Sequence, residues 1–521
     1  MASSRHNNQL KSYLKSHKSG AKSNGDSPVR YGSPKRTSNS PARMSPSSKG
    51  QRQVASPGQS AKDIKPRNVP VKSSNAKSLQ PKNISRGYYR KPTMESMPEE
   101  LLMKIFQHMS ASELLTAACV CRQWLKLTAD NLIWEKLFIQ LTSRVKPDEQ
   151  GQRLGTPLKG PPETKWKREC IHWCRKRRNH KITALLKKIS PYTFMPANTE
   201  KALQKLCITW QLVLTDINKT EHIFQHSDVF CFPTTTTIRW YSLEPPPVKS
   251  LKCLAIFALS PIFFRKDGSA DTANACQRSL LLETQLNPSQ HAIVECDDLV
   301  NLHVINQGLL LATWKDGGEI AFISLCVHNH MLVQRCCLGT SSKEYIPPSL
   351  KPKFDDVDTQ YGLHHFSCVI ELRNQRTVLW SHPFTNLHCE KEDIGDGFVH
   401  LIPVRPDVVT DHTFTNKKLT LPWKTDIFKG IVQNLCILDM TLLDEFKSPM
   451  WTVSNPVKVL PDEDAPLSYN YDGEPYVIKY EDDKGKVTIQ LVTDGDTRYV
   501  VTGIMVDVSL ATINSWFSTS Y

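Results

Sequence analysis

The chain has 521 residues, enough for two or three domains, and a formal net charge of +15 at neutral pH. Its most continuous apolar run, residues 253–264, is too short to cross a bilayer, which takes about 20 residues. The N-terminus is polar and basic and has no apolar signal segment. The 15 cysteines follow no regular spacing, and their odd number excludes a complete disulfide framework. These features predict a soluble protein of the cytoplasm, the nucleus or both, with reduced cysteines and no membrane partner.

The positive charge is concentrated in residues 1–93. This segment holds 20 Lys and Arg against two acidic residues, a net charge of +18, which leaves −3 for the rest of the chain. It is rich in Ser, Pro, Lys and Asn and has few large apolar residues, so we expect it to be disordered. A basic tail suits nuclear import or loose contact with nucleic acid, but its few tyrosines do not suggest a base-stacking surface among its charges. Specific nucleic-acid recognition is therefore not expected.

Three sites in this tail share the pattern Ser-Pro-x-basic, at Ser27, Ser33 and Ser40. The pattern has the local form that proline-directed kinases favour, so these serines are candidates for phosphorylation. Each phosphate would add a charge of about −1.5 to −2 and offset part of the charge of the tail. The alternative is a solvated tail in which the Ser-Pro pairs are incidental.

Residues 94–140 have the pattern of several short helices. Ser96 with Glu99, and Ser110 with Glu113, have the spacing of capping boxes, and Asp130 or Asn131 can cap a last helix. Apolar residues recur at helical spacing after each of these caps. About 45 residues rarely bury enough surface for independent stability, and this stretch has more apolar side chains than one small core can hide. We interpret it as a module that completes its core against a partner; the alternative is an ordinary helical subdomain.

The order of apolar residues in this stretch resembles the F-box family. The resemblance runs without a gap through Met97-Pro98-Glu99-Glu100-Leu101-Leu102, Ile105-Phe106, Leu114-Leu115, Val120-Cys121-Arg122-Gln123-Trp124 and Leu132-Ile133-Trp134. Met97 stands where the family more often has Leu. The resemblance implies docking onto the S-phase kinase-associated adaptor that links F-box proteins to a cullin–RING ubiquitin ligase. The implied adaptor contacts are Met97, Pro98, Leu101, Ile105, Leu115, Val120, Cys121, Trp124 and Leu125.

Residues 141–219 are predicted to form a loop followed by a helical linker. Pro and Gly dominate residues 141–162, and helical spacing of apolar residues follows in 163–189 and 198–215. We expect these helices to hold the first helical module rigidly on the rest of the chain. The basic run at residues 175–178 is interpreted as a solvated helix face, with a localisation signal as the alternative.

Residues 220–521 are predicted to form a large, mainly antiparallel β body resembling a sandwich, which makes the fold class α+β. Short apolar segments include 252–259, 292–296, 302–314 and 320–338. Two hairpins are expected, one turning at residues 374–375 and one at 482–486, and the second continues into a strand over 498–508. One large β domain is the preferred interpretation, although a boundary near 345–360 could divide it.

No motif of a common enzyme class is present, so no catalytic residue and no cofactor are predicted. The best metal candidate is a set formed by Cys170, His172, Cys174 and His180, but its spacing is crowded for a zinc site and helix packing is preferred. The pairs His328/His330 and His364/His365 are expected to be local histidines of the β body. Cys336 and Cys337 are expected on opposite faces of a strand, which disfavours a shared site.

Together these features predict a non-catalytic, substrate-recruiting subunit of a ubiquitin ligase. The F-box would hold the adaptor, and the β body would hold an unidentified target protein. Tethering then raises the effective concentration of the target near the ubiquitin-loaded enzyme. Two alternatives stay open: a scaffold protein that acts with the adaptor outside a ligase, and a protein that associates with nucleic acid through its tail.

Overall fold

The computed structural model describes residues 97–143, 160–241, 243–265, 267–286, 293–348, 357–358, 362–390, 394–465 and 470–521. The serines of the Ser-Pro sites, Ser27, Ser33 and Ser40, and the expected cap Ser96 lie outside this range. No helix in the described part is both long enough and apolar enough to cross a membrane.

The first described residues fold into four short helices, α2 (Glu99–Phe106), α3 (Ala111–Ala117), α4 (Arg122–Leu127) and α5 (Asn131–Thr142). The expected capping box of the second helix is confirmed: Ser110 accepts a hydrogen bond from the Glu113 backbone, and the Glu113 carboxylate accepts one from the Ser110 backbone. Asp130 caps α5 through the backbone N–H groups of its first turn. Pro98 lies just outside α2, as its N-cap, and not within the first turn.

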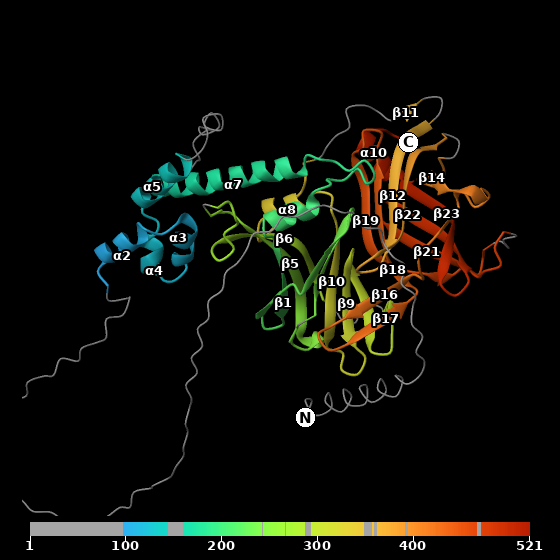
Figure 1. The fold of residues 1–521 in the computed structure, drawn as a ribbon, viewed down its shortest axis with the longest axis horizontal. Coiled ribbons are helices and arrows are strands. Elements are labelled where there is room, and N and C mark those ends of the chain that lie inside the picture. Colours follow the sequence, from blue (N-terminus) through green and yellow to red (C-terminus); the bar gives the residue numbers. More distant parts are fainter. Residues whose placement is uncertain are drawn as a thin grey trace, which may run out of the picture. The chain divides into compact units, whose positions relative to one another are not determined.

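A long helix, α7 (Lys165–Leu186), follows a short 3₁₀ helix η2 (Pro162–Thr164) and packs along α5 (Figure 1). One of its faces is buried at successive turns by Cys170, Cys174, Arg178 and Ile182. Arg178 corrects our expectation that residues 175–178 form a solvated face. Its guanidinium is buried and donates hydrogen bonds to the hydroxyl of Ser260 (3.0 Å) and the backbone carbonyl of Cys337 (2.5 Å). Arg175, Lys176 and Arg177 are exposed.

The first half of the β body contains two antiparallel sheets and two further helices. One sheet has the strand order β2-β1-β5-β6 and the other β3-β4-β10-β9-β8-β7. The elements are α8 (Thr199–Lys205), β1 (Thr209–Asp216), β2 (Glu221–Gln225), β3 (Asp228–Cys231), β4 (Thr235–Trp240), η3 (Val248–Ser250), β5 (Leu251–Pro261), β6 (Cys276–Gln285), β7 (Glu295–Cys296), β8 (Val300–Asn306), β9 (Leu309–Trp314), β10 (Ile320–His328) and α9 (Leu332–Leu338).

The second half contains two more antiparallel sheets, a small β16-β17 hairpin and a C-terminal helix. The sheets have the orders β11-β12-β18-β19, with β13 also on β12, and β14-β23-β22-β21-β20, with β15 also on β23. The elements are β11 (Val357–Asp358), β12 (Gly362–Arg373), β13 (Val378–Cys389), β14 (Phe398–Val404), η5 (Val409–Asp411), β15 (Thr413–Phe414), β16 (Thr420–Lys424), β17 (Lys429–Gln433), β18 (Leu435–Leu443), β19 (Pro449–Lys458), β20 (Leu460–Pro461), β21 (Pro475–Asp482), β22 (Gly485–Asp494), β23 (Arg498–Ser509) and α10 (Leu510–Phe517).

Each half has its own apolar core. In the first, β1, β5, β4 and β10 bury their apolar residues together with α8 and α9; in the second, β12 and β18 face β22 and β23. The two halves meet where β10 and β4 contact β12, β18 and β19, and the β16-β17 hairpin packs on β8 to β10 (Figure 1). The fold class is as predicted, a small helical region with a large antiparallel β body, and both expected hairpins are confirmed by the pairing of β12 with β13 and β21 with β22.

Two segments differ from the sequence predictions. The expected helix at 198–215 ends after Lys205, and β1 begins at Thr209. Cys207 has a positive φ of 48°, which stops the helix, and Trp210, Leu212 and Leu214 then alternate into the core with period two. The expected strand over 320–338 ends at His328 and gives way to α9. Cys336 and Cys337 are therefore consecutive residues of a helix, and both are buried.

Candidate functional site

The helical module completes its core with residues from elsewhere in the same chain. Leu102, Phe106 and Trp134 lie at the centre of that core and are fully buried. Cys170 and Cys174 of α7, with Ile262 and Phe263 directly after β5, close it from the side of the β body. This corrects the expectation that the module needs a partner protein for its core, since α7 and the residues that follow β5 supply the missing surface.

The nine residues that the F-box resemblance marks as adaptor contacts lie outside the buried core of the module. Six of them are exposed, and Met97, Leu115 and Trp124 are half-buried and pack against the core. We call the nine residues the outer face: Met97, Pro98, Leu101, Ile105, Leu115, Val120, Cys121, Trp124 and Leu125.

Exposure separates the two sides of the module clearly. On α2, Leu102 and Phe106 point into the core, and Leu101 and Ile105, one position earlier in each turn, are 48% and 39% exposed. Val120 and Leu125 are 63% and 50% exposed. Isolated exposed apolar residues are ordinary, but several on adjoining short helices are typical of a protein-binding surface.

The geometry of α4 fixes part of the outer face. Trp124 is half-buried, and its ring packs edge-on against Phe106 with centroids 5.3 Å apart, which ties α4 to α2. The Cys121 sulfur caps α4 by accepting a hydrogen bond from the Trp124 backbone N–H at 3.5 Å. Leu125 then projects from α4 into solvent. The outer face is thus built on packed helices, and this preorganisation lowers the entropic cost of binding.

The residues considered for a metal do not converge. Cys170 and Cys174 are buried in the core of the module, and the hydrogen bond with Cys174, together with burial, raises the pKa of the Cys170 thiol. His172 and His180 are exposed, away from the buried face of α7. Within the described residues, no three His, Cys, Asp or Glu side chains form a group that could hold a metal ion.

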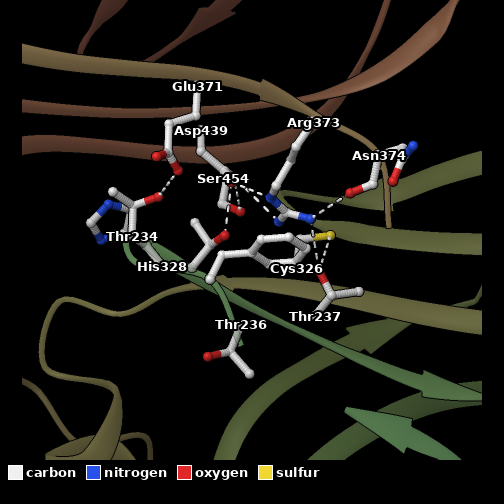
Figure 2. Close-up of polar contacts among 12 residues, drawn as sticks. Thr234, Thr236, Thr237, Cys326, His328, Glu371, Arg373, Asn374, Asp439 and Ser454 are labelled. Atoms are coloured by element: carbon white, nitrogen blue, oxygen red, sulfur yellow. Dashed lines mark hydrogen bonds and ion pairs between the residues drawn. The ribbon is translucent and has the colours of Figure 1, made fainter. Parts of the chain in front are cut away.

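A buried polar network joins the two halves of the β body. Figure 2 shows Arg373 of β12 with its guanidinium against the carboxylate of Asp439 and the hydroxyl of Thr237, which accepts a hydrogen bond at 2.9 Å. Asp439 also accepts hydrogen bonds from Thr235 (2.7 Å) and Ser454 (2.7 Å). Strands β4, β12, β18 and β19 therefore share one ion pair, and its charges are compensated.

Two further titratable groups lie in the same network. Burial raises the pKa of Glu371, which accepts a hydrogen bond of 2.5 Å from Thr234. Burial, with a smaller effect from His330, lowers the pKa of His328 to about 3. The backbone N–H of His330 donates to Nδ1 of His328 (3.1 Å), so Nε2 carries the proton and donates to Thr441 (2.7 Å). Because these polar groups already bond one another, the arrangement is suited to fastening two sheets and not to presenting a nucleophile.

A cavity of about 250 Å³ lies beside the network. It is bounded by β6, β10, α9, β19 and the β8–β9 turn, and His328, Cys326 and Ser454 form part of its wall. His328 and Ser454 already have hydrogen-bond partners, and burial raises the pKa of the Cys326 thiol, which makes it a poor nucleophile. Sequence reasoning missed this network because its members are single Thr, Ser, Arg and Asp residues scattered over strands.

Sequence reasoning also missed the contacts that join the module to the β body. Ser112 of α3 donates a hydrogen bond of 2.5 Å to Asp271, and Ile262 and Phe263 enter the core of the module. The apolar run at 253–264 contained a usable signal, since it continues for three residues beyond β5, where a strand pattern alone gives no reason for buried side chains.

Comparison with known proteins identifies the class of this module. The family model of the F-box-like domain matches residues 94–140. The chain thus carries an F-box, and the outer face lies on it.

The similarity extends far beyond this domain. The chain is 29% identical to F-box only protein 15 of Macaca fascicularis over 82% of its own length and 100% of the relative. It is also 29% identical to F-box only protein 15 of Homo sapiens, over 86% of that protein, and to that of Mus musculus, over 99%. The chain therefore resembles F-box only protein 15 across the F-box and most of the β body. A solved structure of MucB with MucA has a TM-score of 0.09 and 9% identity to the chain, and it carries no argument about the fold.

Proposed function

We propose that this protein is a substrate-recognition subunit of a cullin–RING ubiquitin ligase. In this proposal the outer face of the F-box binds the S-phase kinase-associated adaptor, and the β body recruits a target protein. The observation that carries the proposal is that the apolar residues of the F-box form two sets, one buried in its core and one on its outer face. The chain covers the core side with its own α7 and the residues that follow β5, whereas none of the nine residues of the outer face is buried and six of them are exposed.

The mechanism in this proposal is positional. Helix α7 has 22 residues, so it spans about 33 Å, and it runs from the F-box to the β body (Figure 1). A target on the β body and an adaptor on the F-box would be held at a fixed separation, which raises the effective concentration of target lysines near the ubiquitin-loaded enzyme. No residue of this chain performs covalent chemistry in such a scheme, which operates in the cytoplasm or the nucleus.

Binding of the purified adaptor tests the proposal. The double variant Leu101→Ala/Val120→Ala removes two exposed side chains from the outer face and leaves the buried core intact. We expect weaker adaptor binding by about 2 kcal/mol, roughly thirtyfold, as measured by calorimetry. Met97→Ala/Pro98→Ala is expected to act in the same direction.

Ile217→Ala/Ile223→Ala is a matched control, because both isoleucines are exposed on the β1–β2 hairpin. It should bind the adaptor as tightly as the unmodified chain. Equal affinity in the outer-face variants and this control would refute the contact assignment. If the chain and adaptor form a stable pair that does not add a cullin in gel filtration, the result favours a scaffold role outside a ligase.

A further inference from the structure

A surface at the end of α7 that lies away from the F-box combines exposed apolar residues with lysines. Tyr192 and Ile189, in the segment between α7 and α8, are 73% and 51% exposed. Phe446, in the turn between β18 and β19, is 51% exposed. Lys187, Lys188 and Lys447 accompany them and are exposed as well. We call these six residues the α7-end surface.

The two segments of this surface are far apart in sequence but meet in space. The ammonium group of Lys447 lies 5.3 Å from the ring centroid of Phe194, a cation–π contact. The same ammonium donates a hydrogen bond of 2.5 Å to Ser367 in β12. Figure 1 shows the chain leave α7, run toward α10 and β19, and return to α8. The lysine thus fastens the 187–198 segment to the β body.

Both segments are held by internal hydrogen bonds. Ser190 donates its N–H to the carbonyl of Met195 (2.9 Å) and accepts from the N–H of Phe194 (3.0 Å), and Met195 is buried as an anchor. In the β18–β19 turn, Asp444 accepts from the Ser448 backbone (2.8 Å) and from the indole of Trp516 in α10 (3.1 Å). The exposed aromatic residues therefore project from ordered segments, which limits the entropy lost on binding.

The backbone at the junction is strained. Phe194 has φ 54° and Lys447 has φ 59°, and these two non-glycine residues contact each other. A left-handed conformation is unfavourable for a residue with a Cβ, and such residues concentrate at functional sites. Glycine would relieve the strain at position 447 but would lose the ammonium group that makes both contacts.

We propose that the α7-end surface binds an acidic segment of the target protein that carries at least one large apolar side chain. This inference rests on the proposed function and adds the place and the chemistry of target recognition. Apolar side chains of the segment would cover Tyr192, Ile189 and Phe446, and its carboxylates would meet Lys187, Lys188 and Lys447. The site lies at the opposite end of α7 from Cys170 and Cys174, the residues of this helix that complete the F-box core.

Charge and shape argue against other occupants. A second copy of this chain would place the same patch on itself across a two-fold axis, so lysines would face lysines. A nucleic acid would use many phosphate contacts along its backbone, whereas this surface offers three lysines, and one of them, Lys447, already contacts Phe194 and Ser367. An acidic, partly apolar peptide fits both the charge and the apolar side chains.

The test uses the full chain, with a phage-displayed library of random 12-residue peptides as the probe. We expect enriched peptides to combine two or more Asp or Glu with Leu, Phe or Trp. For a synthetic copy of one such peptide, Lys187→Glu/Lys188→Glu and Tyr192→Ala/Phe446→Ala should each raise the Kd at least tenfold. A photoreactive phenylalanine analogue in place of Tyr192 should crosslink to the peptide.

Matched controls come from other exposed pairs of the β body. Lys417→Glu/Lys418→Glu reverses two exposed lysines, and Ile427→Ala/Ile431→Ala trims two exposed isoleucines; neither should change the Kd. The proposal is overturned if no acidic peptides are enriched, if the control pairs weaken binding as much, or if duplex DNA binds more tightly through the same lysines. Adaptor affinity is measured on every variant. If the chain binds the peptide but not the adaptor, the proposed ligase function is refuted and the peptide site is retained.

Discussion

Ser112 in α3 of the F-box donates a hydrogen bond of 2.5 Å to the carboxylate of Asp271, which lies between β5 and β6. Both side chains are buried. Asn274 donates a second bond to the same carboxylate at 3.1 Å. Burial by itself would raise the pKa of Asp271, but these hydrogen bonds outweigh it and the pKa lies below its ordinary value. The contact therefore holds a charged carboxylate at the junction between the F-box and the β body.

Replacing Ser112 by alanine should destabilise this junction. The variant leaves a buried carboxylate without its main donor, and a hydrogen bond to a charged group contributes about 1.5–3 kcal/mol. We expect that loss in the free energy of unfolding measured with urea. Thr116→Ala is the control. Thr116 is exposed, and its hydrogen bond to the side chain of Asn274 is long, at 3.4 Å. Its loss should therefore change the free energy of unfolding by less than about 0.5 kcal/mol. Equal losses in the two variants would contradict a special role for the Ser112 contact.

Arg178 provides a second test of the attachment of α7. Its guanidinium reaches Ser260, Gln277 and the carbonyl of Cys337, which belong to β5, β6 and α9. Lysine keeps the charge but cannot make this forked set of bonds, so Arg178→Lys should cost roughly 2–3 kcal/mol in thermal or chemical unfolding. Arg177→Lys, one position earlier and exposed, should lie within about 0.5 kcal/mol of the unmodified chain. A stable Arg178→Lys protein would mean that its hydrogen bonds contribute little.

Local signals in the sequence were sufficient for much of the fold. The capping box at Ser110 and Glu113, and the cap at Asp130, are contacts within one helical turn, so their spacing alone identifies them. The hairpins at 374–375 and 482–486 are likewise set by turn residues between alternating strands. The outer face of the F-box followed from family resemblance, and the structure buries none of those residues fully, whereas adaptor binding itself stays a prediction.

The remaining features depend on contacts between distant segments. Ile262 and Phe263 complete the core of the F-box from about 130 positions away, and no periodic pattern marks that role. Nothing in the sequence distinguishes Arg178 from its exposed neighbours, because the residues of β6 and α9 that bury it are distant in the chain. The segment at 332–338 was predicted wrongly for a different reason. Apolar residues at i, i+1, i+4 and i+5 suit a helix as well as a buried strand, and the break is local: β10 ends at His328, and Met331, with φ 56°, is the N-cap of α9.

The ion pair between Arg373 and Asp439 should be essential to the junction between the two β halves. Asp439→Asn removes the countercharge and leaves a buried guanidinium uncompensated, which typically costs 3–5 kcal/mol. Unfolding followed by circular dichroism measures this loss. Asp494→Asn breaks the ion pair with Arg498, which is partly exposed on β22 and β23, and should cost less than about 1 kcal/mol. Comparable effects would show that the buried network is dispensable.

His328 should make the stability of the β body depend on pH. Its pKa is about 3 in the folded protein and near 6.5 when unfolded, so between these values the unfolded chain binds one more proton. Stability from this group is present above pH 6.5 and is lost as pH falls toward 3, at about 1.4 kcal/mol per pH unit. His328→Gln keeps a donor for Thr441 but does not titrate. The free energy of unfolding of both proteins is measured with urea from pH 7 to pH 4. As the pH falls, the variant should lose about 1.4 kcal/mol less per pH unit than the unmodified chain. Parallel curves for the two proteins would show that His328 is not the neutral, buried group that the contact with Thr441 implies.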